Sequence, residues 1–225
     1  MTGTLAFVAL LLSVAGAPSD RAVNAHSFLA LGDSYTIGES VQRRDSWPEQ
    51  LAAKLRSDGI AIEPPEIVAR TGWTTDELSE AMDRAALRGP YALVTLLIGV
   101  NDQYRGRDAV TFRPRFVRLL ERGIALAGGD ARHVVVISIP DYGVTPFATG
   151  RDPASIAAAI DSFNAVCREE AERHHARFAD VTPISRRAAA DGTLVADDGL
   201  HPSALMYREW LAVIAPEAGA ALRTR

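Results

Sequence analysis

The sequence has little sulfur, almost no lysine and no excess of positive charge. Cys167 is the only cysteine among 225 residues, which excludes an intramolecular disulfide framework and a cysteine-rich zinc site. The 24 Lys and Arg residues are outnumbered by 28 Asp and Glu, giving a net charge of −4. This balance argues against a nucleic-acid partner, whose phosphates require clustered cations. The only lysine, Lys54, does not follow a glycine, so a Gly-Lys phosphate loop is excluded as well.

Hydrophobic runs long enough to cross a bilayer, which takes roughly 20 apolar residues, are also missing. The uncharged run Leu5–Ala17 is shorter and ends in small residues before Pro18, which is typical of a secretory signal peptide. A hydrophobic N-terminal helix and an uncleaved anchor are the alternatives. We expect residues 1–17 to be removed on export to the periplasm or the medium. A single domain over residues 18–225 would remain, with no stable insertion in a membrane.

After the N-terminus, strand-like and helix-like segments alternate. Short apolar runs predict five strands, at Phe28–Leu31, Ile67–Ala69, Leu93–Ile98, Val134–Ile139 and Phe178–Val181. The third and fourth runs are dominated by apolar residues, which is typical of strands buried on both faces of a parallel sheet. Five strands that alternate with helices predict an α/β fold, with right-handed crossovers and helices on both faces of the sheet.

Helix starts and buried helix faces are visible between these runs. Ser46–Glu49 and Thr74–Glu77 have the spacing of capping boxes and predict the first turns of two helices. Stripes of apolar residues at helical spacing, from Phe112 to Gly123 and from Ile156 to Cys167, predict two more helices. Cys167 continues the second stripe, so we interpret it as a core residue. A last helix is expected to start at Pro202.

A ligand of such a sheet lies beyond the carboxyl ends of its strands, and a serine stands at one of these ends. Ser34 directly follows the first strand. A serine hydroxyl becomes a nucleophile only when a base within hydrogen-bonding distance takes its proton. Of the five histidines, only His201 lies at a position expected at this edge, and Asp198 precedes it by three residues. The carboxylate of Asp198 can orient the ring of His201, whose other nitrogen would then face Ser34.

Acyl transfer also needs hydrogen-bond donors for the negative oxygen that develops on the carbonyl. Three donors are expected at strand ends, namely the backbone N–H groups of Ser34 and Gly72 and the side-chain amide of Asn101. Each signal alone is common in ordinary turns; their joint placement at one edge of the sheet is what favours a catalytic site. For Asp33 we favour a structural role, bonding the backbone around Ser34, over that of a second catalytic carboxylate.

These segments resemble the four motif blocks of the SGNH (GDSL-type) hydrolase family. The blocks are Gly32-Asp33-Ser34-Tyr35, Gly72, Gly99-Val100-Asn101-Asp102 and Asp198-Gly199-Leu200-His201. The resemblance runs from about Phe28 to Ile214, with Tyr35 where the name of the motif has leucine. It implies a flavodoxin-like three-layer α/β/α sandwich with a five-stranded parallel sheet. It also implies cleavage of esters or thioesters without a metal or other cofactor.

By the same resemblance Ser34 is the nucleophile, His201 the base and Asp198 its orienting carboxylate, and Ser34, Gly72 and Asn101 form the oxyanion hole. The second glycine of an α/β-hydrolase nucleophile elbow is missing after Ser34. A binding module that uses the serine loop to hold an anion is a further alternative, but it leaves the Asp198–His201 pair unexplained.

The substrate is less defined by the sequence. Aromatic residues in the loops at this edge are candidate pocket walls, namely Tyr35, Trp73, Tyr104 and Tyr142, and Asp141–Phe147 is a candidate specificity loop. No long lid insertion is visible, which favours esters of short acyl groups or single-chain lipids. Small molecules, lipids and glycans all stay open as the source of the ester. Carbohydrate O-acetylesterase, acyl-thioesterase and acyltransferase activities are alternatives on the same site.

Overall fold

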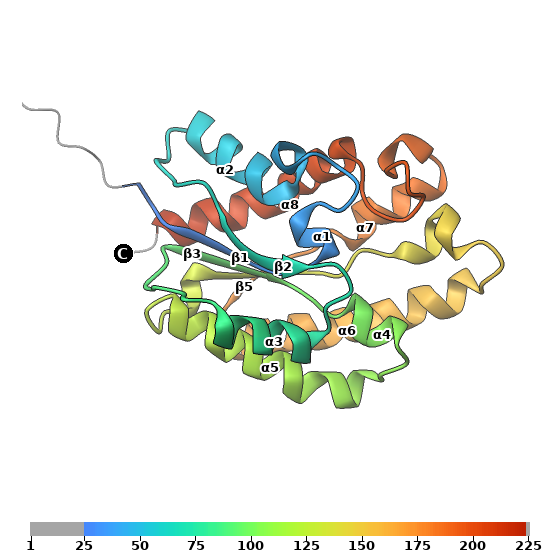
Figure 1. The fold of residues 1–225 in the computed structure, drawn as a ribbon, viewed down its shortest axis with the longest axis horizontal. Helices are drawn as coiled ribbons and strands as arrows, with labels where there is room; N and C mark the ends of the chain where they lie inside the picture. The colour runs from blue at the N-terminus through green and yellow to red at the C-terminus, as the bar shows by residue number, and fades with distance from the viewer. Residues whose placement is uncertain (1–24, 224–225) are drawn as a thin grey trace, which may run out of the picture.

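The computed structural model describes residues 25–223 and contains one parallel sheet with the strand order β2-β1-β3-β4-β5 (Figure 1). The strands are β1 (Phe28–Asp33), β2 (Glu66–Arg70), β3 (Leu93–Leu97), β4 (Val134–Ile137) and β5 (Arg177–Ala179). Each lies where an apolar run predicts a strand. The predicted signal peptide, residues 1–17, lies outside the described residues.

Helices cover both faces of the sheet, which confirms the three-layer α/β/α architecture. α2 (Trp47–Ser57) and α8 (Ala204–Arg223) lie on one face, and α3 (Thr75–Arg84), α5 (Ala109–Leu126) and α6 (Pro153–Arg173) lie on the other (Figure 1). The short helices α1 (Ser34–Ile37), α4 (Val100–Tyr104) and α7 (Thr182–Ser185) follow β1, β3 and β5. Since α1, α3, α4, α6 and α7 follow the carboxyl ends of the five parallel strands in turn, the segments that lead into them gather at one edge of the sheet.

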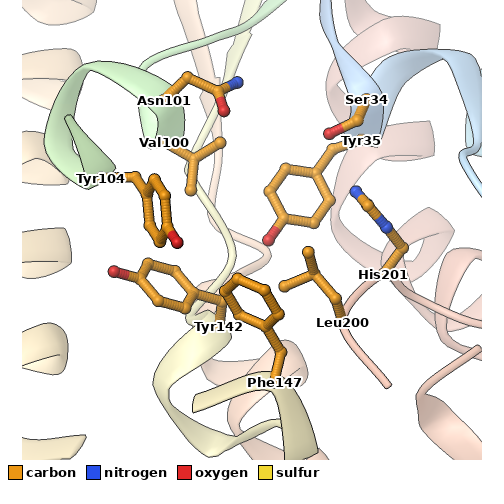
Figure 2. Close-up of a pocket in the computed structure, with 9 residues that line it drawn as sticks. All are labelled: Ser34, Tyr35, Val100, Asn101, Tyr104, Tyr142, Phe147, Leu200 and His201. Carbon is orange, nitrogen blue, oxygen red and sulfur yellow. The ribbon is translucent and has the colours of Figure 1, made fainter. Parts of the chain in front are cut away.

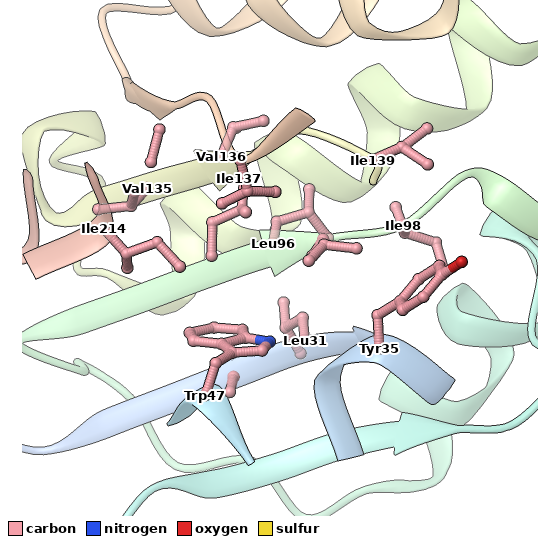
Figure 3. Close-up of a cluster of buried hydrophobic side chains, with 14 of the residues drawn as sticks. Leu31, Tyr35, Trp47, Leu96, Ile98, Val135, Val136, Ile137, Ile139 and Ile214 are labelled. Atoms are coloured by element: carbon pink, nitrogen blue, oxygen red, sulfur yellow. The ribbon is translucent and has the colours of Figure 1, made fainter. Parts of the chain in front are cut away.

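The core lies on both sides of the central strands. Every residue of β1, β3 and β4 is buried, as their apolar sequences predict. On one side the ring of Phe112 in α5 stacks on that of Phe163 in α6, with 4.5 Å between centroids, and Cys167 is buried beside them as a core residue. On the other side Trp47 and Ile214 pack over the sheet (Figure 3). Tyr35 belongs to the same cluster, so the core continues without a break to the edge that carries the site.

The capping predictions differ in outcome. The capping box at Thr74 is confirmed, with the Thr74 N–H donating to Glu77 Oε2 at 2.8 Å. The helix predicted after Ser46 is confirmed, since α2 begins at Trp47. Its capping box is wrong, because the Ser46 hydroxyl donates to the carbonyl of Arg43 at 2.8 Å. The three residues before Ser46 form a short 3₁₀ helix, which supplies that carbonyl, and Glu49 pairs with Arg43 at 2.9 Å.

The last helix starts two residues later than predicted, at Ala204. Pro202 instead forms an isolated antiparallel bridge with Val195. This bridge closes the base of the loop that contains Asp198 and His201.

Candidate active site

Ser34 owes its position to the junction of β1 and α1. Asp33 ends the strand and caps the helix, accepting a hydrogen bond from the N–H of Tyr35 at 3.0 Å. Ser34 is therefore the first residue of α1, where backbone N–H groups have no acceptor within the helix. The junction is tight, because a Cβ on Gly32 would lie 2.5 Å from the carbonyl oxygen of Leu97. Close packing of β1 on β3 thus fixes where the serine emerges.

Asp33 itself is fully buried. Burial raises its pKa to about 8, although the hydrogen bond from the Tyr35 N–H acts in the opposite direction. The neighbouring Asp102 raises this pKa further. The Oδ2 atom of Asp33 has no hydrogen-bond partner among residues 25–223. The carboxyl is therefore uncharged near neutral pH, and its contact with the helix backbone agrees with the structural role favoured from the sequence.

Asp198 and His201 form a hydrogen-bonded pair. The Oδ2 atom of Asp198 lies 2.6 Å from Nδ1 of His201. A carboxylate can only accept, so Nδ1 carries the proton and the neutral ring leaves Nε2 free as an acceptor. The second oxygen, Oδ1, accepts from the backbone N–H groups of Leu200 and His201, both at 2.9 Å. The sequence spacing of three residues thus produces the orientation that it predicts.

Ser40 supports the same carboxylate from a distant part of the chain. Its hydroxyl donates to Asp198 Oδ2 at 2.6 Å, although 158 positions separate the two residues. Partial burial tends to raise the pKa of Asp198, but hydrogen bonds from Ser40, His201 and the backbone outweigh it and hold the pKa well below its usual range. Ser40 adopts a left-handed backbone conformation, with a φ of 63°. No sequence signal pointed to this residue.

Ser34 and His201 line one pocket although they are far apart in the sequence. The space is about 390 Å³ including its open mouth, and the ring of His201 points toward Ser34 (Figure 2). Both side chains are nearly buried, with 5% and 7% of their surface exposed. The lining residues are Ser34, Tyr35, Val100, Asn101, Tyr104, Tyr142, Phe147, Leu200 and His201.

The two other predicted oxyanion donors lie at the ends of the neighbouring strands. Asn101, in the first turn of α4, lines the pocket, and its amide donates one hydrogen to the carbonyl of Trp73 at 2.9 Å. The second amide hydrogen stays available. Gly72 is not among the lining residues; its φ of +83° lies in the left-handed region that favours glycine. Its carbonyl accepts from Arg105 at 2.6 Å.

The aromatic walls agree in part with the sequence. Tyr35, Tyr104 and Tyr142 line the pocket, whereas Trp73 does not. Trp73 is half-buried against the core and contributes its carbonyl, not its ring, to the site. Val100 and Leu200 also line the pocket, beside Asn101 and His201. Their places inside two of the motif blocks were the only sequence signal that they belong to the pocket wall.

The segment that follows β4 closes the far side of the pocket. It contains two short 3₁₀ helices, Tyr142–Val144 and Pro146–Ala148, which overlap the predicted specificity loop Asp141–Phe147. The N–H of Phe147 donates to the carbonyl of Gly199 at 2.9 Å. The wall that carries Phe147 is therefore joined directly to the loop that carries His201.

Asp102, the last residue of the third motif block, joins neighbouring helices through polar contacts. It is completely buried and accepts from the N–H and hydroxyl of Thr75 at 2.9 and 2.7 Å. Arg107 completes the cluster at 2.6 Å. The contacts attach α4 to the start of α3, which holds Asn101 beside the Gly72 turn.

Residues 25–223 contain neither a membrane-spanning helix nor a cluster of metal-ligating side chains. No helix in that range is long and apolar enough to cross a bilayer. Within it, His, Cys, Asp and Glu side chains form no group of three that could hold a metal ion.

The family of the chain follows from its match to a family model. A family model described as the GDSL-like lipase/acylhydrolase family matches residues 30–209. The chain belongs to this family. The resemblance of its four sequence blocks to GDSL-type hydrolases is confirmed.

Solved structures with the same fold include a lipase/acylhydrolase and several esterases. A lipase/acylhydrolase from Enterococcus faecalis has a TM-score of 0.67 and 21% identity, over 89% of this chain and 98% of that one. The psychrotrophic esterase EstA from Pseudoalteromonas sp. has a TM-score of 0.66 and 17% identity, over 85% and 97% of the two chains. Axe2, an acetylxylan esterase from Geobacillus stearothermophilus, has a TM-score of 0.62 and 16% identity, over 89% and 95%. At these identities the likeness shows the fold.

Sequence similarity to curated proteins is confined to part of the chain. An uncharacterized protein of Mycobacterium tuberculosis is 32% identical in an alignment of 88 positions, which covers 36% of this GDSL hydrolase. The match spans 15% of the length of that relative.

Proposed function

We propose that this GDSL hydrolase cleaves carboxylic esters of short acyl groups through an acyl-serine intermediate. In this proposal Ser34 is the nucleophile, His201 the general base and Asp198 the carboxylate that orients it. One observation carries the proposal: Ser34 shares a pocket with His201, whose Nδ1 is bonded to Asp198 at 2.6 Å.

In the first half-reaction, Ser34 Oγ attacks the acyl carbonyl carbon while Nε2 of His201 takes the hydroxyl proton. The charged Asp198 stabilises the imidazolium that forms. The carbonyl oxygen becomes negative and accepts hydrogen bonds from the N–H groups of Ser34 and Gly72 and from the Asn101 amide. His201 then gives its proton to the departing alcohol oxygen, and the acyl group stays on Ser34.

In the second half-reaction, water takes the place of the alcohol. His201 removes a proton from the water, whose oxygen attacks the acyl carbonyl. The same three donors hold the second oxyanion. When the bond to Ser34 breaks, His201 returns the proton to the serine oxygen and the free acid leaves. In each half-reaction the His201 imidazole thus accepts one proton and then donates it.

The size of the pocket supports short acyl groups over lipid chains. Its space of about 390 Å³ includes the open mouth, and Tyr142 and Phe147 face Ser34 and His201 across it (Figure 2). Deacetylation of carbohydrates, cleavage of thioesters and transfer of the acyl group to an alcohol use the same steps with another leaving group or acceptor. The fold does not choose among them, since related structures include an acetylxylan esterase and a lipase/acylhydrolase.

The test is a pair of serine substitutions. Ser34→Ala removes the nucleophile and is expected to lower turnover of p-nitrophenyl acetate by roughly 10⁶-fold, the loss seen for another serine hydrolase. It also abolishes labelling by a fluorophosphonate. Ser162→Ala, at an exposed serine of α6 whose hydroxyl bonds only its own helix, is the matched control and keeps both. Labelling that survives in Ser34→Ala refutes the proposed nucleophile.

The acyl preference has its own measurement. Rates on p-nitrophenyl esters from acetate to palmitate, and on the matching thioesters, are expected to be highest at the short end. A maximum at long chains contradicts the proposed substrate class without affecting the assignment of Ser34. We further propose export, on the evidence of the run Leu5–Ala17. The N-terminal sequence of the protein recovered outside the cytoplasm tests it.

A further inference from the structure

An arginine lies across two aromatic rings at the pocket. The guanidinium carbon of Arg151 is 4.9 Å from the ring centroid of Tyr104 and 5.2 Å from that of Phe147. Its Nη2 donates to the Tyr104 hydroxyl at 2.8 Å. Both rings line the catalytic pocket, and they are 45% and 40% exposed. The cation therefore lies at the solvent side of the pocket wall.

The rings beneath Arg151 form a connected platform. Tyr104, Tyr142 and Phe147, which we call the aromatic rim, have ring centroids 6.0 to 6.3 Å apart in all three pairs. The hydroxyl of Tyr142 donates to Gln103 at 3.1 Å. Tyr104 follows Asn101 by three residues in α4, so the rim begins on the helix that holds an oxyanion donor. Contact with two ring faces attracts a guanidinium and restrains it.

Within residues 25–223, Arg151 has no acidic partner, which distinguishes it from other arginines near the site. Arg105 pairs with Glu77 at 3.2 Å and Arg186 with Asp141 at 2.9 Å. Among residues 25–223 no carboxylate lies within ion-pair distance of Arg151, and its hydrogen bond to Tyr104 uses one of five N–H donors. Most donors of this guanidinium are thus left over beside two rings of the pocket wall, and its charge is uncompensated by this part of the chain.

We propose that Arg151 binds an anionic group, a carboxylate or a phosphate, on the ester whose carbonyl lies at Ser34. The inference rests on the proposed function and adds a substrate class to it: esters that carry a negative charge on the acyl or the alcohol side. The planar guanidinium suits both anions because two parallel N–H groups can bond two of their oxygens. The aromatic rim holds the guanidinium ready, which reduces the entropy lost on binding.

The experiment compares charged and neutral esters in Arg151→Gln. One pair, 4-acetoxybenzoate and its methyl ester, differs in charge on the alcohol side. The other, the mono-p-nitrophenyl ester of adipic acid and p-nitrophenyl hexanoate, differs on the acyl side. Arg208→Gln, which removes the same charge from an exposed position of α8, is the control. In Arg151→Gln we expect kcat/KM to fall roughly 10-fold for the charged member of one pair, mainly through KM, and to stay unchanged for both neutral esters.

The outcomes separate the two proposals. A loss confined to one pair supports the inference and shows which side of the ester carries the anion. Equal changes for charged and neutral esters, or a loss matched by Arg208→Gln, overturn it. In either case Ser34→Ala still tests the nucleophile on the neutral esters, so the proposed function can stand when the anion site fails. Since charge pairs are screened by salt, the preference for the charged ester in wild type should also decrease as ionic strength rises.

Discussion

At the scale of single residues, Asp198 accepts four hydrogen bonds within one loop and its neighbourhood. Two come from the backbone, one from the ring of His201 and one from the hydroxyl of Ser40. Only the Ser40 bond can be removed without altering the loop itself. In the proposed mechanism Ser40 is thereby a positioning residue, which acts on the reaction through the Asp198 carboxylate.

Replacing Ser40 by glycine is expected to lower kcat about 10-fold, the usual value of a hydrogen bond to a charged group, and to leave KM nearly unchanged. Glycine is chosen because it adopts the positive φ of this position without strain. Ser40→Asn tolerates the same conformation and keeps a donor, so it should recover part of kcat. Steady-state kinetics on one neutral ester measure both variants. Equal kcat in Ser40→Gly and wild type contradicts the role given to this hydroxyl.

At the scale of elements, the junction of β1 and α1 contains a buried acid. The pKa of Asp33 is raised from 3.8 to about 8 by burial, so the folded protein keeps this proton at pH values where the unfolded chain has lost it. The free energy of unfolding contributed by this group is therefore largest below about pH 4, falls as pH rises toward 8 and is constant above that.

Asp33→Asn removes this titration while its side-chain oxygen can still cap α1. We expect the stability of wild type relative to Asp33→Asn to fall between pH 5 and pH 8, by at most about 1.4 kcal/mol per pH unit. Urea unfolding of both proteins at intervals across this range gives the difference directly. Two curves that run parallel from pH 5 to pH 9 are incompatible with a protonated Asp33.

Much of this element-scale arrangement could be predicted from the sequence. β3 and β4 are visible because both of their faces are buried, and Ser34 and His201 are visible because parallel strands bring their carboxyl ends to one edge. Ser40 and Arg151 were missed because their partners lie 158 and 47 positions away and no local pattern connects such residues. The cap predicted at Ser46 failed for a related reason, since spacing does not show what the preceding turn offers.

At the scale of the whole molecule, Cys167 reports on global unfolding. It is the only cysteine, it is 1% exposed, and burial raises the pKa of its thiol well above the usual range. Native protein is expected to be inert to a thiol reagent such as DTNB, and labelling should begin only where circular dichroism shows loss of structure. A free model thiol in the same denaturant series is the control. Rapid labelling of the native protein refutes the buried placement.

In the proposed mechanism the backbone hydrogen bond from Phe147 to Gly199 links substrate size to proton transfer. An oversized ester that displaces Phe147 also moves the chain two residues before His201, through this hydrogen bond. Asp198 moves with the same loop, so the acid and the imidazole shift together while Ser34, anchored on β1, stays in place. Oversized esters should thus be discriminated against in the rate of acylation, even when they bind.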